Sequence, residues 1–328
     1  MVVVGHAYCV HLVERVGDAE LGRLLRSPFA HEELVERGPL VFIDTQSMVP
    51  DAAAMSTLET VPVVIAGPTP SPLVDVAAEG DELAELDFAV ETNPLASVAL
   101  VLLLRGSERR SIGEGLVAES AVYSMLQAGP EFARWREGQT RRDRQPQDEP
   151  AVLVRRAGNE LILTLNRPTV HNAFSVAMRD QLIEALVVAE ADPSLRVVLE
   201  GAGQSFCSGG DLGEMGSRPD PATAHQVRLR RSVGRMLASM ADRTEARLHG
   251  ACMGAGIELP AFVEKVTARP DSRIGLPEIG LGLIPGAGGT VSVTRRIGRH
   301  RSALLALSGR AIDTATALSW GLVDEVRA

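Results

Sequence analysis

Two glutamates, Glu258 and Glu278, stand in stretches whose residue types could carry acid–base chemistry. Glu258 lies near the end of "HGACMGAGIELP", where small residues precede a carboxylate in otherwise apolar text, and Glu278 follows twenty residues later in "LPEIGLG". Small residues let a ligand approach the backbone closely, and N–H groups in such turns can stabilise negative charge. Two carboxylates in a mostly apolar pocket have their protonation equilibria pushed apart, which suits a general acid and a general base near neutral pH.

Each of these polar residues also has a plainer interpretation. Glu258 can be an acid in the first turn of a helix, where the dipole favours it, and Glu278 a solvated carboxylate in a loop. His171 and His249 lie beside turns, where histidines are more often hydrogen-bonded structural groups than catalysts. We read no Ser-His-Asp arrangement and no metal-ligand cluster from the sequence, and therefore predict no metal site.

The elements that must position these residues follow a predicted linker at 138–150, "GQTRRDRQPQDEP", which lacks aliphatic side chains. Two strands are predicted at 151–156 ("AVLVRR") and 160–168 ("ELILTLNRP"), joined by the turn "AGN", and a helix is predicted after Ser175 as its N-cap. The apolar face of that helix should consist of Met178, Leu182, Ala185, Leu186 and Ala189.

The alternation continues downstream. We expect strands at 196–201 and 245–250, a helical stretch over 222–241, and a short helix ending near Lys265, with Gly-rich turns between them. Alternating strands and helices predict an α/β domain, whose active residues tend to lie in the turns from strand to helix.

The first 137 residues carry less readable chemistry. "LVFIDT" and "VPVVIAG" are predicted strands, and residues 113–135 are predicted as an amphipathic helix ended by Gly129-Pro130. This half has no Gly-rich turn beside a carboxylate.

Composition excludes several classes of protein. The 328-residue chain is 45% hydrophobic and 23% charged, and its net charge of −9 provides no basic surface for nucleic acid or an anionic membrane. The cysteines, Cys9, Cys207 and Cys252, lie far apart without metal or disulfide spacing; Cys207 and Cys252 should be buried as small hydrophobes. We find no signal peptide and no membrane span, so we expect a soluble, reduced, cytoplasmic protein.

Four segments in the second half together resemble the enoyl-CoA hydratase/isomerase (crotonase) family. They are "NRPTVHNAF" (166–174), "SFCSGGDL" (205–212), "HGACMGAGIEL" (249–259) and "LPEIGLGLIPGAGGT" (276–290). Each alone is a weak signal because Gly-rich turns are common, but four in the family's order over residues 151–328 are specific. The resemblance implies a crotonase-like spiral of repeated ββα units, preceded by a degenerate α/β N-terminal region.

The resemblance also implies a function and a site. The chain would hydrate 2-enoyl-CoA thioesters by syn addition of water, with coenzyme A as part of the substrate and no separate cofactor. Glu258 would be the base that activates water, and Glu278 the acid that protonates the α-carbon. The N–H groups of Gly210 and Ala255 would form the oxyanion hole. Asp211 would cap a helix that opens there and so fix the Gly210 N–H.

Substrate and coenzyme A contacts are carried over from the same segments. They fall on Ala173, Ser208, Gly210, Asp211, Leu212, Gly256, Pro277 and Gly286. The family further implies a homo-oligomer, a trimer or a hexamer.

The sequence departs from the family pattern in two places. Ala255 stands where the usual third turn has glycine, so it should have negative φ. The family's helical tail is missing after residue 328, whereas residues 93–135, including the run "GLVAES", resemble that tail. We hypothesise that residues 1–137 are a degenerate crotonase-like unit whose tail-like helices serve the second half, within the chain or across subunits.

Several alternatives remain open from the sequence. One is a double-bond isomerase or another acyl-CoA lyase, decarboxylase or hydrolase of the same fold; isomerases typically need only the later acid, so two glutamates favour hydration. Another is a catalytically idle assembly partner, against which the retention of both acids argues. A nucleotide-binding switch is excluded because the sequence contains no G-x-x-x-x-G-K-[ST] loop.

Overall fold

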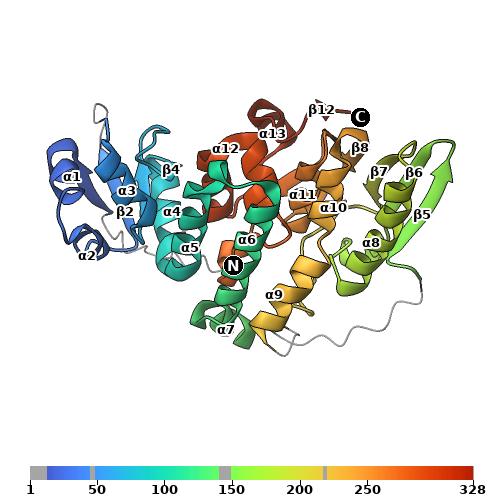
Figure 1. Cartoon of the computed structure of the whole chain (residues 1–328), viewed down its shortest axis with the longest axis horizontal. Coiled ribbons are helices and arrows are strands. Elements are labelled where there is room, and N and C mark those ends of the chain that lie inside the picture. Colours follow the sequence, from blue (N-terminus) through green and yellow to red (C-terminus); the bar gives the residue numbers. More distant parts are fainter. Residues whose placement is uncertain (1–12, 45–48, 140–148, 217–219, 328) are drawn as a thin grey trace, which may run out of the picture.

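A computed structural model describes residues 13–44, 49–139, 149–216 and 220–327 of the chain (Figure 1). The second half is built on a six-stranded sheet in the order β12-β10-β8-β7-β6-β5 and a two-stranded sheet of β11 and β9. The strands are β5 (Val152–Ala157), β6 (Glu160–Leu165), β7 (Arg196–Gly201), β8 (Thr244–Leu248), β9 (Ala251–Met253), β10 (Lys265–Ala268), β11 (Arg273–Gly275) and β12 (Glu325–Val326). All strand pairs in these two sheets are parallel except β5 with β6. The predicted α/β class is confirmed.

The helix after β6 forms as the sequence predicts. Helix α8 (Val176–Ala191) begins at Ser175, whose side chain accepts a hydrogen bond from Met178 N. Its buried residues are Met178, Leu182, Ala185, Leu186 and Ala189, the five expected from the helical spacing. Local propensity and hydrophobic periodicity therefore suffice to define this element.

The remaining helices of this half are shorter than predicted. The stretch at 222–241 forms two helices, α9 (Pro221–Arg230) and α10 (Val233–Ser239), because the backbone leaves the helical region at Arg231 and Ser232. The short helix predicted to end near Lys265 is α11 (Ala255–Glu258), followed by a 3₁₀ turn at Pro260–Phe262. The last helices are α12 (Gly289–Ser308), interrupted at Gly298, and α13 (Thr314–Trp320).

The first half contains a separate parallel sheet of four strands. It consists of β1 (Glu14–Gly17), β2 (Leu40–Asp44), β3 (Val64–Gly67) and β4 (Val76–Ala77), with helices α1 (Asp18–Leu24), α2 (Ala30–Val35) and α3 (Ala52–Thr60) between them. The two predicted strands correspond to β2 and β3. Four helices follow: α4 (Gly80–Thr92), α5 (Pro94–Arg105), α6 (Ile112–Gln127) and α7 (Pro130–Glu137). As predicted, the helix from 113 ends at Gly129-Pro130, where α7 begins.

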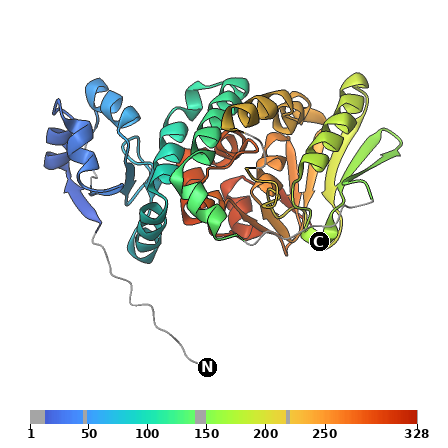
Figure 2. The same cartoon turned by 90° about the horizontal axis from the view of Figure 1, so that it is seen from below.

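Helices α5 and α6 pack directly on the second half. In both views α6 stands beside α12 and α9 (Figures 1 and 2), and it contacts both of them, while α5 contacts α12. One continuous apolar core includes Leu100 of α5, Leu126 of α6, Phe132 of α7 and the interior of the six-stranded sheet. The helices that resemble the family's tail thus cover the second half within the same chain.

The boundaries of the sequence-based domains stay a prediction. Residues 140–148 of the linker expected at 138–150 lie outside the described residues, as does Cys9. The proposal that residues 1–137 are a degenerate copy of the family fold likewise stays a prediction. Among the described residues no single helix is long and apolar enough to cross a membrane; α4 and α5 meet that test only when taken together across a 110° bend.

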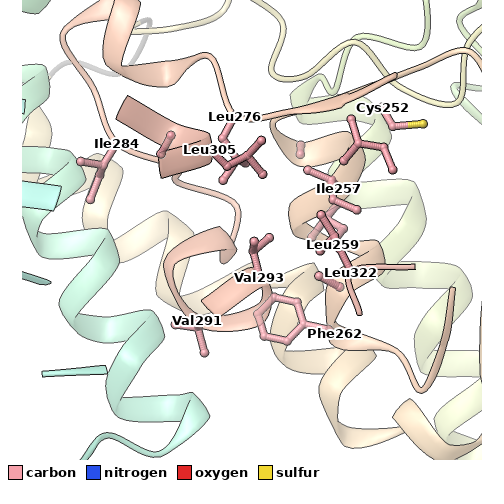
Figure 3. Close-up of a cluster of buried hydrophobic side chains, with 14 of the residues drawn as sticks. Cys252, Ile257, Leu259, Phe262, Leu276, Ile284, Val291, Val293, Leu305 and Leu322 are labelled. Atoms are coloured by element: carbon pink, nitrogen blue, oxygen red, sulfur yellow. The ribbon is translucent and has the colours of Figure 1, made fainter. Parts of the chain in front are cut away.

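A buried apolar cluster fixes α11 against the start of α12. Ile257 and Leu259 of the α11 segment, Phe262 of the following turn, and Val291 and Val293 of α12 point into it (Figure 3). All five side chains are less than 9% exposed. Burying a side chain of this size contributes about 1.5–3 kcal/mol, so the cluster holds the two elements that carry the polar site.

Candidate active site

A cavity of about 1040 Å³ lies between the two halves of the chain. Its walls come from α6, α9, α10 and α11, from the loop before α12, and from the segment around Phe174 and Gly210. Glu258, Glu278, Gly210 and Ala255 all line it, so the tertiary structure brings together the four residues predicted to carry the chemistry. Glu258 is 2% and Glu278 7% exposed, which excludes the plainer interpretation of Glu278 as a solvated loop carboxylate.

Glu258 is held at the end of α11 by main-chain donors. Its Oε2 atom accepts hydrogen bonds from Ala287 N (2.7 Å) and Gly289 N (2.8 Å), and its main-chain oxygen accepts from Ser292 Oγ (2.6 Å). Burial raises the pKa of Glu258 to about 7, although the two N–H donors oppose the rise by favouring the ionised form. The carboxyl group is therefore fixed in position and close to half-ionised at neutral pH.

A third glutamate, Glu119 of α6, enters the same site from the first half of the chain. Its Oε1 accepts from Gly288 N (2.7 Å), and its Oε2 from Thr290 N (3.0 Å) and Thr290 Oγ1 (2.7 Å). Burial, together with the charge of Glu258, raises the pKa of Glu119 to about 8, against the effect of its three donors.

Glu119 and Glu258 both accept hydrogen bonds from the N–H groups at the start of α12. The N–H groups of Ala287 and Gly289 point to Glu258, whereas those of Gly288 and Thr290 point to Glu119. These N–H groups would otherwise lack partners at a buried helix start. Gly288 has φ +112°, and a Cβ at Gly289 would lie 2.6 Å from Glu258 Cγ, so this turn requires both glycines.

Sequence reasoning missed Glu119, although the run "GLVAES" that contains it had been singled out for its resemblance to the family's tail. The hydrogen-bond donors to Glu119 lie about 170 residues further along the chain. Nothing in the sequence of residues 115–120 indicates that this carboxylate meets them. The expectation that chemistry in the first half is sparse was therefore wrong for this one residue.

Glu278 lies beside Gly254, the residue that precedes α11. Its Oε2 atom is buried and has no hydrogen-bond partner among the described residues. A Cβ at Gly254 would come within 2.2 Å of Glu278 Oε1. Burial raises the pKa of Glu278 well above its ordinary range, and the charge of Glu258 raises it further. The site thus favours the protonated form of Glu278, and its buried Oε2 is available to meet a ligand.

The N–H groups of Gly210 and Ala255 are free to bind a ligand oxygen. Both residues line the cavity, and within the described ranges neither N–H donates to a main-chain or side-chain acceptor. The neighbouring N–H groups are used instead: Asp211 N donates to Phe174 O and Gly254 N to Gly275 O. Because buried N–H groups are nearly always paired, two free ones in one cavity mark a site for an anionic oxygen.

The turn that carries Ala255 explains why alanine is tolerated there. Ala255 is the first residue of α11 and has negative φ, as predicted, because Gly254 before it takes the left-handed conformation at φ +51°. Gly256 is a glycine for another reason: a Cβ there would meet Cys207 O at 2.3 Å. Gly256 does not line the cavity, and its contact with the substrate stays a prediction.

Asp211 has a different local role from the one predicted. No helix begins after it; residues 212–216 form a turn, and Asp211 Oδ1 accepts from Gly213 N (3.0 Å). Its Oδ2 pairs with Arg167 Nη1 at 2.8 Å, and both side chains are largely buried. Arg167 also donates to Ala173 O at 2.6 Å. The pair joins the "NRP" segment to the turn that presents Gly210, so Asp211 still fixes that turn.

The residues expected to contact coenzyme A fall into two groups. Gly210, Asp211 and Gly286 line the cavity; Ala173, Ser208, Leu212 and Pro277 do not. Ser208 and Leu212 are exposed beside it, Leu212 at 48%. These contacts stay predictions.

Other polar residues near the site are structural, as expected. His171 Nδ1 lies 3.0 Å from Ser205 Oγ, and His249 Nε2 lies 3.1 Å from Gly203 O. Cys207 and Cys252 are free and buried, and burial raises the pKa of both thiols, that of Cys207 to about 12. Among the residues described, no group of three His, Cys, Asp or Glu side chains could hold a metal ion.

Comparison with known proteins gives a consistent picture for the second half. A family model described as enoyl-CoA hydratase/isomerase matches residues 157–328. The 2,3-dehydroadipyl-CoA hydratase of Escherichia coli K12 is 37% identical over 176 residues, which cover 53% of this chain and 68% of that protein. A mevalonyl-coenzyme A hydratase of Beauveria bassiana is 32% identical, over 51% of this chain and 62% of its own length. The chain thus spans about two thirds of these relatives.

Solved structures agree with the sequence comparisons. The enoyl-CoA hydratase of Thermoplasma volcanium GSS1 superposes with a TM-score of 0.51 at 33% identity, over 55% of this chain and 72% of that one. The enoyl-CoA hydratase of Mycobacterium smegmatis gives a TM-score of 0.51 at 32% identity, over 55% and 71%. The second half therefore has the crotonase fold. The chain belongs to the enoyl-CoA hydratase/isomerase family of enzymes.

Proposed function

We propose that the chain is an enoyl-CoA hydratase, which adds water across the 2,3 double bond of an enoyl-CoA thioester in the syn sense. Glu258 acts as the base that takes a proton from water as its oxygen bonds to the β-carbon. Glu278 acts as the acid that delivers a proton to the α-carbon. The water oxygen and one of its protons end on the β-carbon as a hydroxyl group, and no metal or redox cofactor takes part.

The free N–H groups of Gly210 and Ala255 support the electrostatic part of this mechanism. When water adds to the β-carbon, negative charge develops on the thioester oxygen as the α-carbon gains enolate character. Two preset donors in a buried cavity stabilise that charge, and each is worth about 3 kcal/mol in comparable sites. This charge exists only in the transition state and intermediate, so the donors accelerate the reaction and do not merely tighten binding.

The protonation states support the division of labour between the two glutamates. A base must be ionised before water adds, and the pKa of Glu258, about 7, allows this at neutral pH. An acid must hold its proton until it is delivered to the α-carbon, and burial raises the pKa of Glu278, which favours its protonated form. The single observation that carries the proposal is that both carboxyl groups and both free N–H groups line one cavity.

The strongest rival is a double-bond isomerase of the same fold. Such a reaction moves a proton between two carbons and needs no group that activates water. Glu258 is nevertheless anchored by two N–H donors while no hydrogen bond to its Oε1 occurs among the described residues, which leaves that atom for a water molecule. The other rival is a catalytically idle assembly partner. It is disfavoured because burying carboxyl groups costs free energy, and such a partner would gain nothing from them.

The test is an assay of the intact chain with enoyl-CoA thioesters, with chromatography of the products. We expect 3-hydroxyacyl-CoA from the parent, and losses of kcat of at least about a hundredfold in Glu258→Gln and in Glu278→Gln. A product with only a shifted double bond would favour the isomerase, and full activity in both variants would remove the mechanism. No turnover by the parent would favour the assembly partner.

We further propose that the protein works in the cytoplasm on an acyl-CoA partner and as a homo-oligomer, a trimer or a hexamer. Light scattering on the full chain tests the last point, and a monomer at micromolar concentration would contradict it.

A further inference from the structure

Several arginines line the cavity, and the proposed chemistry uses none of them; Arg228 is packed deepest against its aromatic wall. Arg228 of α9 lines the cavity, and its guanidinium carbon lies 4.7 Å from the centroid of the Tyr123 ring of α6. On its other side Tyr123 packs against Gly286, where a Cβ would lie 2.4 Å from the ring. Glu258, Glu278 and Glu119 all act electrostatically on Tyr123. Tyr123 thus contacts Arg228 and lies within electrostatic reach of the three carboxyl groups.

The hydrogen-bond partners of Arg228 are all neutral. Its Nε donates to Ser120 Oγ (3.0 Å), its Nη1 to Gln127 Oε1 (3.3 Å), and its Nη2 to Ser120 O (3.4 Å) and Ser124 Oγ. A guanidinium has five N–H donors, and these four contacts, two of them long, do not exhaust them.

In the described part of the chain no carboxylate lies at ion-pair distance from Arg228, and Glu119 acts on its charge only from further away. Arg228 forms no ion pair within 4 Å there, and the nearby Glu119 directs its oxygens to Gly288 and Thr290. Helix α6 lines the cavity with the apolar residues Leu116, Val117, Ala118 and Ala121 and with the polar residues Glu114, Glu119, Ser120 and Gln127. A partly buried, unpaired guanidinium in such surroundings costs free energy unless an anion joins it.

We propose that Arg228 binds a carboxylate at the far end of the acyl chain, so that the substrates are 2-enoyl-CoA thioesters with a terminal carboxylate. The inference rests on the proposed function and names its substrate class. With the thioester oxygen at Gly210 and Ala255, the acyl chain would run past Tyr123 and end at Arg228. Arginine suits this task because its planar fork binds both oxygens of a carboxylate.

The phosphates of coenzyme A are the other source of anionic oxygens for an arginine. Exposure separates the two roles: Arg231 and Arg235 also line the cavity but are exposed, where a hydrophilic phosphate remains solvated, whereas Arg228 is packed between Tyr123 and two serines. A phosphate contact would also affect every thioester equally, because all of them carry the same coenzyme.

The test uses pairs of 2-enoyl-CoA thioesters of equal chain length that end in a methyl group or in a carboxylate. The parent should prefer the carboxylate, and Arg228→Gln should lower the ratio of the two kcat/KM values by at least about tenfold. Arg228→Lys, which keeps the charge, should restore part of the ratio. The matched control Arg235→Gln removes the same charge from an exposed position and should leave the ratio unchanged.

Binding of the saturated thioesters, measured by calorimetry, gives the same comparison without turnover. If the parent binds the carboxylate form more tightly but hydrates nothing, the proposed function fails and the specificity stands. An equal loss for both members of a pair in Arg228→Gln overturns the inference in favour of a phosphate or structural role. A parent that prefers the methyl end also overturns it, and melting curves of each variant identify any loss of folding.

Discussion

Replacing Glu119 by Gln tests how the site balances burial against hydrogen bonding. Burial and the charge of Glu258 favour the neutral acid, whereas three donors favour the carboxylate, and the balance puts the pKa at about 8 against an ordinary value of 4.5. Since one pKa unit corresponds to about 1.4 kcal/mol, ionising Glu119 costs the folded state up to about 5 kcal/mol relative to the unfolded chain.

The sign of the pH dependence follows from proton binding. Between pH 4.5 and about pH 8 the folded chain keeps the proton of Glu119 while the unfolded chain has released it. Stability from this group is therefore fully present below pH 4.5 and is lost as the pH rises through about 8. Glutamine cannot ionise, so the stability of Glu119→Gln relative to the parent should rise by up to about 5 kcal/mol between pH 4.5 and pH 8.5.

Urea unfolding at the two pH values measures this difference. Trp135 and Trp320, both packed against the main core, report the transition by fluorescence. Any loss of hydrogen bonds in the variant, about 1–3 kcal/mol, is the same at both pH values and cancels in the comparison. Glu137→Gln, which removes an exposed charge on α7, is the control and should show no such change. A relative stability of Glu119→Gln that stays constant or falls with rising pH would refute the reasoning, because the donors would then outweigh burial.

Three further predictions concern the site and its support. The kcat/KM for hydration should rise with pH through an acid limb near pH 7, where Glu258 ionises; a pH profile that is flat from 6 to 8 would contradict its role as the base. Gly254→Ala should lose at least about tenfold in kcat and about 1–2 kcal/mol of stability in urea unfolding, because the φ of Gly254 is +51° and a Cβ there would meet Glu278. The control Gly280→Ala, at a position with open space around it, should change neither kcat nor stability, and equal effects of the two substitutions would contradict the argument. Deleting residues 1–137 should yield an insoluble or inactive core, since it uncovers α12 and removes Glu119; sedimentation and assay of a folded, active core would refute the dependence.

Local sequence patterns predicted several of the elements and part of the site. The spacing of Met178 to Ala189 predicted the buried face of α8, and the cap at Ser175 predicted its start, because helix periodicity and capping are local properties. The Gly-rich turns beside Glu258 and Glu278 likewise indicated where main-chain N–H groups and carboxylates could lie close together. Such turns need small residues, and these are visible in the local sequence.

The groups that complete the site are brought there by the packing of distant helices. Glu119 meets Gly288 and Thr290 because α6 packs on α12, and Arg228 faces Tyr123 because α9 packs on α6. Neither contact can be predicted from the local sequence, because a glutamate or arginine on a helix has the same sequence context whether it faces solvent or a cavity. The partner amides are ordinary residues of a distant turn, and only the packing of the two halves brings them within hydrogen-bond distance.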